Sequence, residues 1–196
     1  MYPSFARQAR RDGCTAAATL FTEIARDEAI HRGWYQTTLR AVTNPGSVRV
    51  PTGDKVHGVP IPAGLPKCSG RTLENLSTAM HGEAFASAKY ALYARQARAT
   101  GQSRLAKLFT NAAAAERTEH FAEEAALAGL VRGNADNLRT AMTGEKYEAT
   151  RMYPSFARQA ASVGDRQAAA LFREIAGDEG MHWSEFAAAL RSLRPA

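Results

Sequence analysis

Apolar side chains recur every three or four residues along most of the chain, a spacing that places them on one face of an α-helix. Between residues 104 and 121 these positions are Leu105, Leu108, Phe109, Ala112, Ala113 and Phe121. Alanine is abundant, leucine, glutamate and arginine recur, and runs of β-branched residues are absent. The pattern therefore predicts an all-α protein.

An internal repeat organises these helices. The string MYPSFARQA begins the chain and recurs unchanged at 152–160. Without a gap, residues 1–40 match 152–191 at about half of their positions. Chance does not produce such a match, so the two segments should share one structure.

A second and weaker repeat lies inside the C-terminal part. NLSTAMHGE at 75–83 matches NLRTAMTGE at 137–145, and the later matching blocks are offset by one more residue. The second copy therefore contains an extra residue after Glu145. Pro154 follows closely, so we expect a kink or a π-bulge there.

The repeats divide the chain into three segments. Residues 1–43 form a partial copy of the C-terminal helix pair. Residues 44–71 are rich in proline and glycine, which predicts a linker. Residues 72–194 contain two complete helix pairs, and we expect them to form one helical domain.

Composition excludes several classes of protein. The 196 residues carry 25 Lys+Arg against 19 Asp+Glu, a net charge of +6, and the arginine clusters are typical of solvated helix faces rather than of a nucleic-acid interface. No apolar stretch is long enough to span a membrane, and the N-terminus lacks the apolar region of a secretory signal. A cytoplasmic protein is the expectation.

The small number of cysteines also agrees with a cytoplasmic protein. Cys14 and Cys68 are the only cysteines, and they lie far apart in the sequence. This excludes a disulfide framework, a four-cysteine zinc site and a rubredoxin-type iron site.

Candidate chemistry is concentrated in carboxylates and histidines. Glu179 and His182 form a Glu-x-x-His motif that shares one helix face with apolar residues. Burying both groups is costly unless they are paired or bind a metal. A single motif of this kind is more often a surface pair or a helix cap.

The other helices change that interpretation. Carboxylates stand at related positions on four successive helices, namely Glu83, Glu116, Glu145 with Glu148, and Glu179. A ferritin-like di-iron bundle takes one Glu from each of two helices and a Glu-x-x-His from each of the other two. A metal-free helical protein is disfavoured, because acidic groups facing one core raise one another's pKa.

Residues 72–194 resemble rubrerythrin, a ferritin-like di-iron protein, through GEAFASAKY at 82–90, GEKYEATRMYPSFARQA at 144–160 and IAGDEGMH at 175–182. The resemblance implies a four-helix bundle of two αα-hairpins that reduces hydrogen peroxide to water in oxidative-stress defence. It implies two iron ions, with manganese or a mixed pair left open. The implied ligands are Glu83, Glu116, Glu145, Glu148, Glu179 and His182, with Glu148 as a mobile ligand and Tyr90 and Tyr153 bonded to the ligands.

One ligand departs from that pattern. Glu119 stands three residues after Glu116, where the family has histidine, and His120 follows one residue later. Either Glu119 replaces the imidazole as a ligand, or a π-bulge rotates His120 to the position that the family's histidine occupies. We favour Glu119.

The rubredoxin-like domain typical of the family would need four cysteines, which this sequence lacks. The peroxidase would then require a separate electron donor, such as a rubredoxin or a flavoprotein reductase. The alternative is a ferroxidase or iron-binding protein without peroxidase turnover. The double Glu145 and Glu148 favours the first reading, whereas Glu119 and the missing domain favour the second.

The joint between the second and third helices is short. A ferritin-like bundle needs a connection that travels its length, and helices near 25 residues span about 37 Å. Residues 129–136 reach at most about 28 Å. The sequence therefore predicts a domain-swapped homodimer.

Residues 1–43 form an extra helical segment. They repeat Glu28 and His31 but contain no counterpart of Glu145 or Glu148. We interpret the segment as a packing or vestigial helix pair. The alternative is a second, incomplete site that another subunit completes.

Overall fold

The computed structural model describes residues 1–44, 46, 48–53, 61 and 68–193. Within this part of the chain every regular element is a helix, which confirms the predicted all-α class. None of these helices has the length and apolar character needed to cross a bilayer. The chain divides into two compact units, Met1–Leu130 and Val131–Ala196.

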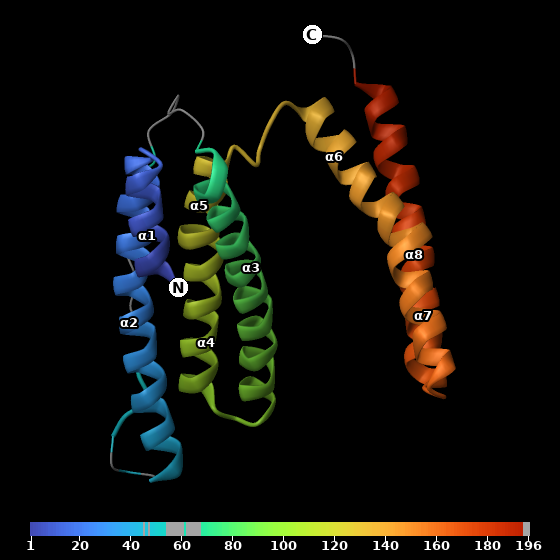
Figure 1. Cartoon of the computed structure of the whole chain (residues 1–196). Helices are drawn as coiled ribbons and strands as arrows, with labels where there is room; N and C mark the ends of the chain where they lie inside the picture. Colours follow the sequence, from blue (N-terminus) through green and yellow to red (C-terminus); the bar gives the residue numbers. More distant parts are fainter. Residues whose placement is uncertain (45, 47, 54–60, 62–67, 194–196) are drawn as a thin grey trace. The chain divides into compact units, whose positions relative to one another are not determined.

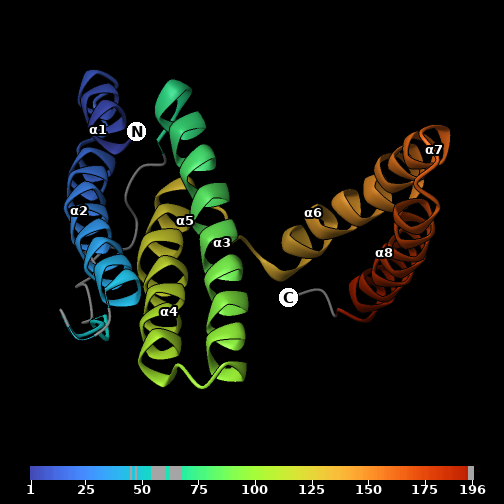
Figure 2. The same cartoon turned by 90° about the horizontal axis from the view of Figure 1, so that it is seen from below.

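The first unit is a four-helix bundle. Two of its members form a hairpin, and the other two are α3 and a long helix that a π-helical segment, η1, divides into α4 and α5 (Figure 1, Figure 2). Helices α2 and α3 run in one direction and α4–α5 in the other. The bounds are α1 Tyr2–Arg11, α2 Thr15–Thr43, α3 Gly70–Ala99, α4 Ser103–Ala115, η1 Glu116–Phe121 and α5 Ala122–Ala128.

The core of the first unit lies where the α1–α2 hairpin meets α3 and α5. Leu20, Phe21 and Leu76 are fully buried there. The ring of Phe21 lies 5.4 Å from that of Phe5 and 6.0 Å from that of Tyr2, measured between centroids. Each such side chain contributes about 1.5–3 kcal/mol of burial free energy, so the partial repeat is an integral part of this bundle.

A disulfide fastens the hairpin to α3. Cys14, in the turn between α1 and α2, is bonded to Cys68, two residues before α3 begins. Beside it, the Asp12 carboxylate accepts hydrogen bonds from the backbone N–H and the hydroxyl of Thr72, at 3.0 and 2.6 Å. The two cysteines are far apart in the sequence, and they meet because both segments reach the same end of the bundle. A disulfide of this kind contributes about 2–4 kcal/mol.

The second unit is a single helical hairpin. Helix α6 (Asn134–Tyr147) continues through the π-helical segment η2 (Glu148–Met152) into α7 (Tyr153–Ser162), and α8 (Arg166–Ser192) packs against all three. The segment η2 confirms the predicted irregularity near Pro154. Among the described residues of this unit, Ala157 and Ala169 alone are buried.

The boundary between the units lies inside the segment expected to form one domain. Residues 72–130 pack with the partial repeat 1–43, whereas residues 131–193 form the separate hairpin. The described residues of the expected linker 44–71 are non-helical up to α3, and the rest of that linker lies outside the described residues.

Candidate metal centre

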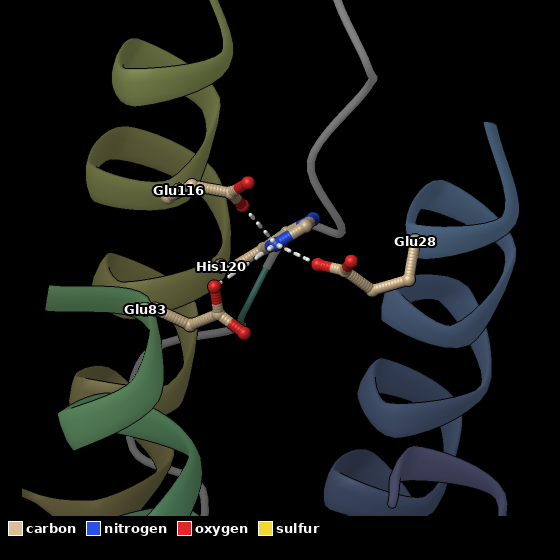
Figure 3. A group of neighbouring side chains, drawn as sticks. All are labelled: Glu28, Glu83, Glu116 and His120. Atoms are coloured by element: carbon tan, nitrogen blue, oxygen red, sulfur yellow. Dashed lines mark ion pairs between the residues drawn. The ribbon is translucent and has the colours of Figure 1, made fainter. Parts of the chain in front are cut away.

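Four potential metal ligands converge inside the first unit. Figure 3 shows the carboxylates of Glu28, Glu83 and Glu116 directed at the ring of His120. One ligand atom from each lies within 4.8 Å of the others. Glu28 comes from α2, Glu83 from α3, and the other two from η1. Three helices of the bundle therefore build one cluster, and all of its members except Glu28 are buried.

The π-helical turn determines that His120, rather than Glu119, joins the cluster. A π-helix has more residues per turn than an α-helix, so His120 occupies the place that the third residue after Glu116 would take in a regular helix. Nδ1 of His120 lies 2.9 Å from Oε2 of Glu116 and 3.8 Å from Oε2 of Glu83. Glu119 is half-buried and lies outside the cluster. The structure thus has the π-bulge alternative rather than the favoured Glu119.

His31 extends the cluster from the partial repeat. Its Nδ1 lies 3.3 Å from Oε1 of Glu116 and 3.8 Å from Oε1 of Glu28. The residue is 1% exposed, and its Nε2 has no hydrogen-bond partner. The Glu28-x-x-His31 motif therefore faces a centre in its own chain. The signal was present in the sequence, because the motif repeats that of Glu179 and His182.

Opposite charges in the cluster shift the titration of its members. Burial alone would lower the pKa of His120, but the carboxylates of Glu116 and Glu83 raise it to about 11. For His31, burial is likewise outweighed by Glu116 and Glu28, which raise the pKa to about 9. Burial would raise the pKa of Glu116, but the two imidazoles lower it to about 2. Without a metal, the centre is therefore held together as a network of ion pairs.

Asp27 closes the cluster on a further side. Its Oδ2 lies 3.4 Å from Nε2 of His120, so the imidazole faces carboxylates at both ring nitrogens. Burial raises the pKa of Asp27, and His120 opposes that shift. A carboxylate bonded to the far nitrogen of a metal-binding histidine fixes the orientation of the ring.

Two further polar side chains lie beside the cluster, and sequence reasoning missed both. The hydroxyl of Tyr2 donates a hydrogen bond to Oε1 of Glu83. Glu124 is completely buried, and neither of its carboxyl oxygens has a hydrogen-bond partner. Burial, reinforced by the charge of Glu83, raises the pKa of Glu124 to about 9. The repeat could have revealed Tyr2, which matches Tyr153, and Glu124 follows His120 by one helical turn.

A cavity of about 440 Å³ opens onto the cluster. Glu28, Glu83 and Glu116 line it together with Tyr2 and Tyr90. Tyr90 thus lies next to the candidate ligands, and burial raises the pKa of its hydroxyl. A small molecule entering this cavity meets three carboxylates and two phenol rings.

The second unit carries a smaller cluster of Glu145, Glu179 and His182. Nδ1 of His182 lies 2.7 Å from Oε2 of Glu179 and 3.5 Å from Oε2 of Glu145. The His182 side chain is 52% exposed, in contrast to its buried counterpart His31. These residues form an open cluster on one hairpin.

Glu148 and Tyr153 lie beside this open cluster. Glu148 begins η2 and is half-buried, and it is not one of the three clustered groups. The ring of Tyr153 stacks on Phe172 at 6.2 Å. Partial burial and the charge of Glu148 raise the pKa of the Tyr153 hydroxyl. Of the expected ligands, Glu83, Glu116 and His120 therefore belong to one cluster, and Glu145, Glu179 and His182 to another.

Comparison with known proteins shows which family this sequence belongs to. The family model for rubrerythrin matches residues 74–190, more than half of the chain. The chain belongs to the rubrerythrin family. It is 33% identical over 158 residues to nigerythrin of Nitratidesulfovibrio vulgaris, covering 74% of this chain and 78% of that protein. It is 34% identical over 137 residues to rubrerythrin of the same organism, covering 63% and 71%.

A rubrerythrin of Porphyromonas gingivalis is 35% identical over 133 residues, which cover 61% of this chain and 66% of the relative. The part matched by the rubrerythrin model contains both clusters except for Glu28 and His31, which precede it. The cluster in the first unit therefore combines candidate ligands from the matched segment with candidate ligands from the partial repeat.

Proposed function

We propose that the chain is a non-haem di-iron peroxidase that reduces hydrogen peroxide to water as a defence against oxidative stress. The observation that carries the proposal is the cluster of Glu83, Glu116, His31 and His120, all buried, with the half-exposed Glu28 beside them. Burying two carboxylates and two imidazoles around one point is costly unless a cation compensates them. Membership of the rubrerythrin family supports iron as that cation.

The donor set fits two metal ions. Carboxylate oxygen and imidazole nitrogen suit iron and also manganese, so a mixed pair is compatible with the same residues. His31 turns its buried Nδ1 toward Glu116 and Glu28 without making a hydrogen bond, as expected of a nitrogen available to a metal. Bound iron would supply the two electrons that, with two protons, convert one hydrogen peroxide into two water molecules.

The remaining residues would position ligands and hold protons. Tyr2 holds Oε1 of Glu83 and leaves Oε2 turned toward His120. Because the pKa of Glu124 is raised to about 9, its carboxyl carries a proton at neutral pH, close to Glu83. Tyr90 lines the cavity through which peroxide would reach the centre. Protons for the product water would come from these groups.

In the second unit, we propose that Glu145, Glu148, Glu179 and His182 are ligands of a centre that is completed by assembly with another chain. Glu148 would be the mobile ligand there, and Tyr153 would bond to the ligands. Glu119 has no ligand role in this proposal. Electrons would come from a separate donor, such as a rubredoxin or a flavoprotein reductase.

A ferroxidase is the second candidate. Both cysteines are joined in a disulfide, so this sequence offers no rubredoxin-type site to deliver electrons. A ferroxidase needs no donor, because oxidation of Fe(II) is itself the function.

Two measurements test the proposal. The first is iron per chain after anaerobic Fe(II) loading of the wild type and of His120→Ala, with Glu119→Gln as the matched control on the same turn. We expect His120→Ala to lose iron and Glu119→Gln to keep it. Near-zero iron in the wild type would overturn the proposal.

The second measurement separates the two candidates. A peroxidase consumes peroxide over many turnovers while a chemical reductant is oxidised in equal amount. A ferroxidase stops after one oxidation of its iron and accumulates Fe(III). Loss of peroxide turnover in His120→Ala, with turnover retained in Glu119→Gln, is the expected result.

A further inference from the structure

Two copies of the same helix pair occupy different environments in this chain. In α1–α2 the repeated side chains are buried, and in α7–α8 their counterparts are partly open to solvent. Leu20 is completely buried, whereas Leu171 is 52% exposed. The matched pairs are Tyr2 and Tyr153, Leu20 and Leu171, Phe21 and Phe172, Ile24 and Ile175, and His31 and His182. Helices α7–α8 therefore present the face that α1–α2 buries against α3–α5.

A domain-swapped dimer is already expected from the sequence. We propose that the Cys14–Cys68 disulfide controls it, because the closed bond keeps α1–α2 of the same chain on the α3–α5 surface and the reduced protein allows this face of α7–α8 from a second copy to dock there instead. The occupant follows from the repeat, because the same side chains already fit that surface in the first unit. The docking rests on the packing of the matched side chains alone. Its consequence for the metal centre rests on the proposed function.

Chain geometry requires that the docked copy come from another molecule. Helix α1 runs antiparallel to α3, since Tyr2 contacts Glu83 and Asp12 contacts Thr72 near the start of α3. A hairpin α6–α8 in the same place must run the same way, so α6 would begin at the far end of the bundle. Helix α4–α5 is about 39 Å long. Residues 129–133, which connect α5 to α6, reach at most about 18 Å.

The two copies differ at the positions that fasten them. Asp165 replaces Cys14, and Val163 replaces Asp12. Helices α1–α2 are thus held to α3 by a disulfide and by two hydrogen bonds that α7–α8 cannot form. With the disulfide closed, α1–α2 stays beside α3 at a high effective concentration and excludes the competing copy.

Reduction opens this fastening. A dithiol reductant gives two electrons and two protons to the Cys14–Cys68 bond and itself becomes a disulfide, which leaves two thiols on this chain. The two copies then compete for α3–α5 by packing alone. In a reciprocal pair of chains each α3–α5 surface is covered, so the exchanged form is a closed dimer with two-fold symmetry.

The exchange changes the ligand set. Glu179 and His182 take the places of Glu28 and His31. Glu145 and Glu148 are added, and α1–α2 has no residues that match them. Two more carboxylates beside Glu83, Glu116 and His120 give the centre additional negative charge for two metal ions.

The first test measures the mass of the full chain by light scattering after oxidation and after treatment with dithiothreitol. We expect a monomer when oxidised and a dimer when reduced. Cys14→Ser should be dimeric without reductant. Equal masses in the two redox states would overturn the control by the disulfide.

The second test traps the docked state. Cys14→Ser combined with Asp165→Cys places a sulfur where Cys14 lies in the first unit, but on the other copy. We expect a disulfide between position 165 of one chain and Cys68 of another, seen as a covalent dimer on a non-reducing gel and mapped by peptide mass spectrometry. Asp165 caps α8 by accepting a hydrogen bond from Ala168, so Cys14→Ser with Asp165→Ser controls for loss of the cap.

A covalent dimer that persists after Cys68→Ser, or no covalent dimer at all, would overturn the docking. This readout does not depend on iron. Failure of iron loading with a successful crosslink would count against the proposed function alone, and the reverse would count against the docking alone.

Discussion

Glu116 lies between two imidazoles, with one carboxylate oxygen 2.9 Å from Nδ1 of His120 and the other 3.3 Å from Nδ1 of His31. All three side chains are almost completely buried. This arrangement keeps the carboxylate ionised and both imidazoles charged when no metal is present. Metal binding must therefore displace protons from the imidazoles, because only neutral imidazole is a ligand.

Replacing Glu116 tests this coupling. Glu116→Gln removes the charge that both imidazoles face, so we expect the metal-free protein to lose about 3 kcal/mol of unfolding free energy at pH 7. Iron loading should be lost as well. Urea unfolding and iron analysis measure the two effects, with Glu119→Gln as the control on the same turn. Unchanged stability and unchanged iron content in Glu116→Gln would contradict the assigned centre.

Glu124 makes stability depend on pH in the opposite sense to an ion-paired carboxylate. Its pKa is raised to about 9 in the folded state, so the unfolded chain releases this proton first as pH rises. The metal-free wild type should therefore lose unfolding free energy between about pH 4.5 and pH 9. At pH 7 the loss amounts to about 3 kcal/mol.

Glu124→Gln keeps the shape of the side chain and cannot ionise. Denaturant unfolding at pH 5 and pH 8 should show that this variant loses less stability than the wild type between the two values. Glu123→Gln, on the same helix, provides the control. An equal pH dependence in wild type and Glu124→Gln would show that Glu124 is not buried as a neutral acid.

The sequence assigned Glu83, Glu116, Glu145 and Glu179 to one expected site, because the repeat places a carboxylate at the same position of each helix. The structure brings Glu83 and Glu116 together, and Glu145 and Glu179 lie in a separate cluster. It favoured Glu119 over His120, and the structure brings His120 to the cluster instead. The choice depends on one additional residue within a helical turn, and spacing alone does not show where a helix widens. The repeat could have drawn attention to Tyr2, but its bond to Glu83 and the burial of Glu124 are long-range features that no local pattern contains.

Both π-helical segments begin at a candidate ligand, η1 at Glu116 and η2 at Glu148. The widened turns accommodate an extra residue without rotating the helix that follows. One of them was predictable, because the repeat contains an insertion close to Pro154. In η1 the sequence allowed a π-bulge but did not require it, since a regular helix with Glu119 as ligand also satisfied the spacing.

Deleting one residue from η1 tests directly whether its widened turn positions His120. Removal of Thr118, which is exposed, converts the segment to Glu-Arg-Glu-His and places His120 three residues after Glu116 in a regular helix. We expect the deletion variant to fold, to retain its helical circular dichroism and to bind iron like the wild type. Thr110, in the regular helix α4, supplies the matched control. Its deletion turns all later side chains by about 100°, so iron binding should be lost. Loss of iron in both deletions would contradict the role of η1.

For the molecule as a whole, the sequence predicted the helical class from local patterns. It expected the C-terminal helix pair to complete the bundle with α3–α5, whereas within one chain the partial repeat α1–α2 packs there. Two copies that share about half of their residues are equally suited to that surface by pattern, and the difference lies in two positions, Asp12 and Cys14. The disulfide joins residues 54 positions apart, a contact that only the folded bundle brings together.

The repeat also provides matched variants for testing the assembly. With the disulfide closed, the centre uses His31, so His31→Ala should weaken iron binding about 10–100-fold while His182→Ala leaves it unchanged. After reduction, the exchanged centre uses His182, and the sensitivity of the two variants should be reversed. Iron per chain, measured for each variant after loading in oxidised and in dithiol-reduced buffer, gives four values from one assay. If His31→Ala and His182→Ala respond alike in both buffers, the two hairpins do not compete for one surface, since competition requires that only one of these histidines serve the centre at a time.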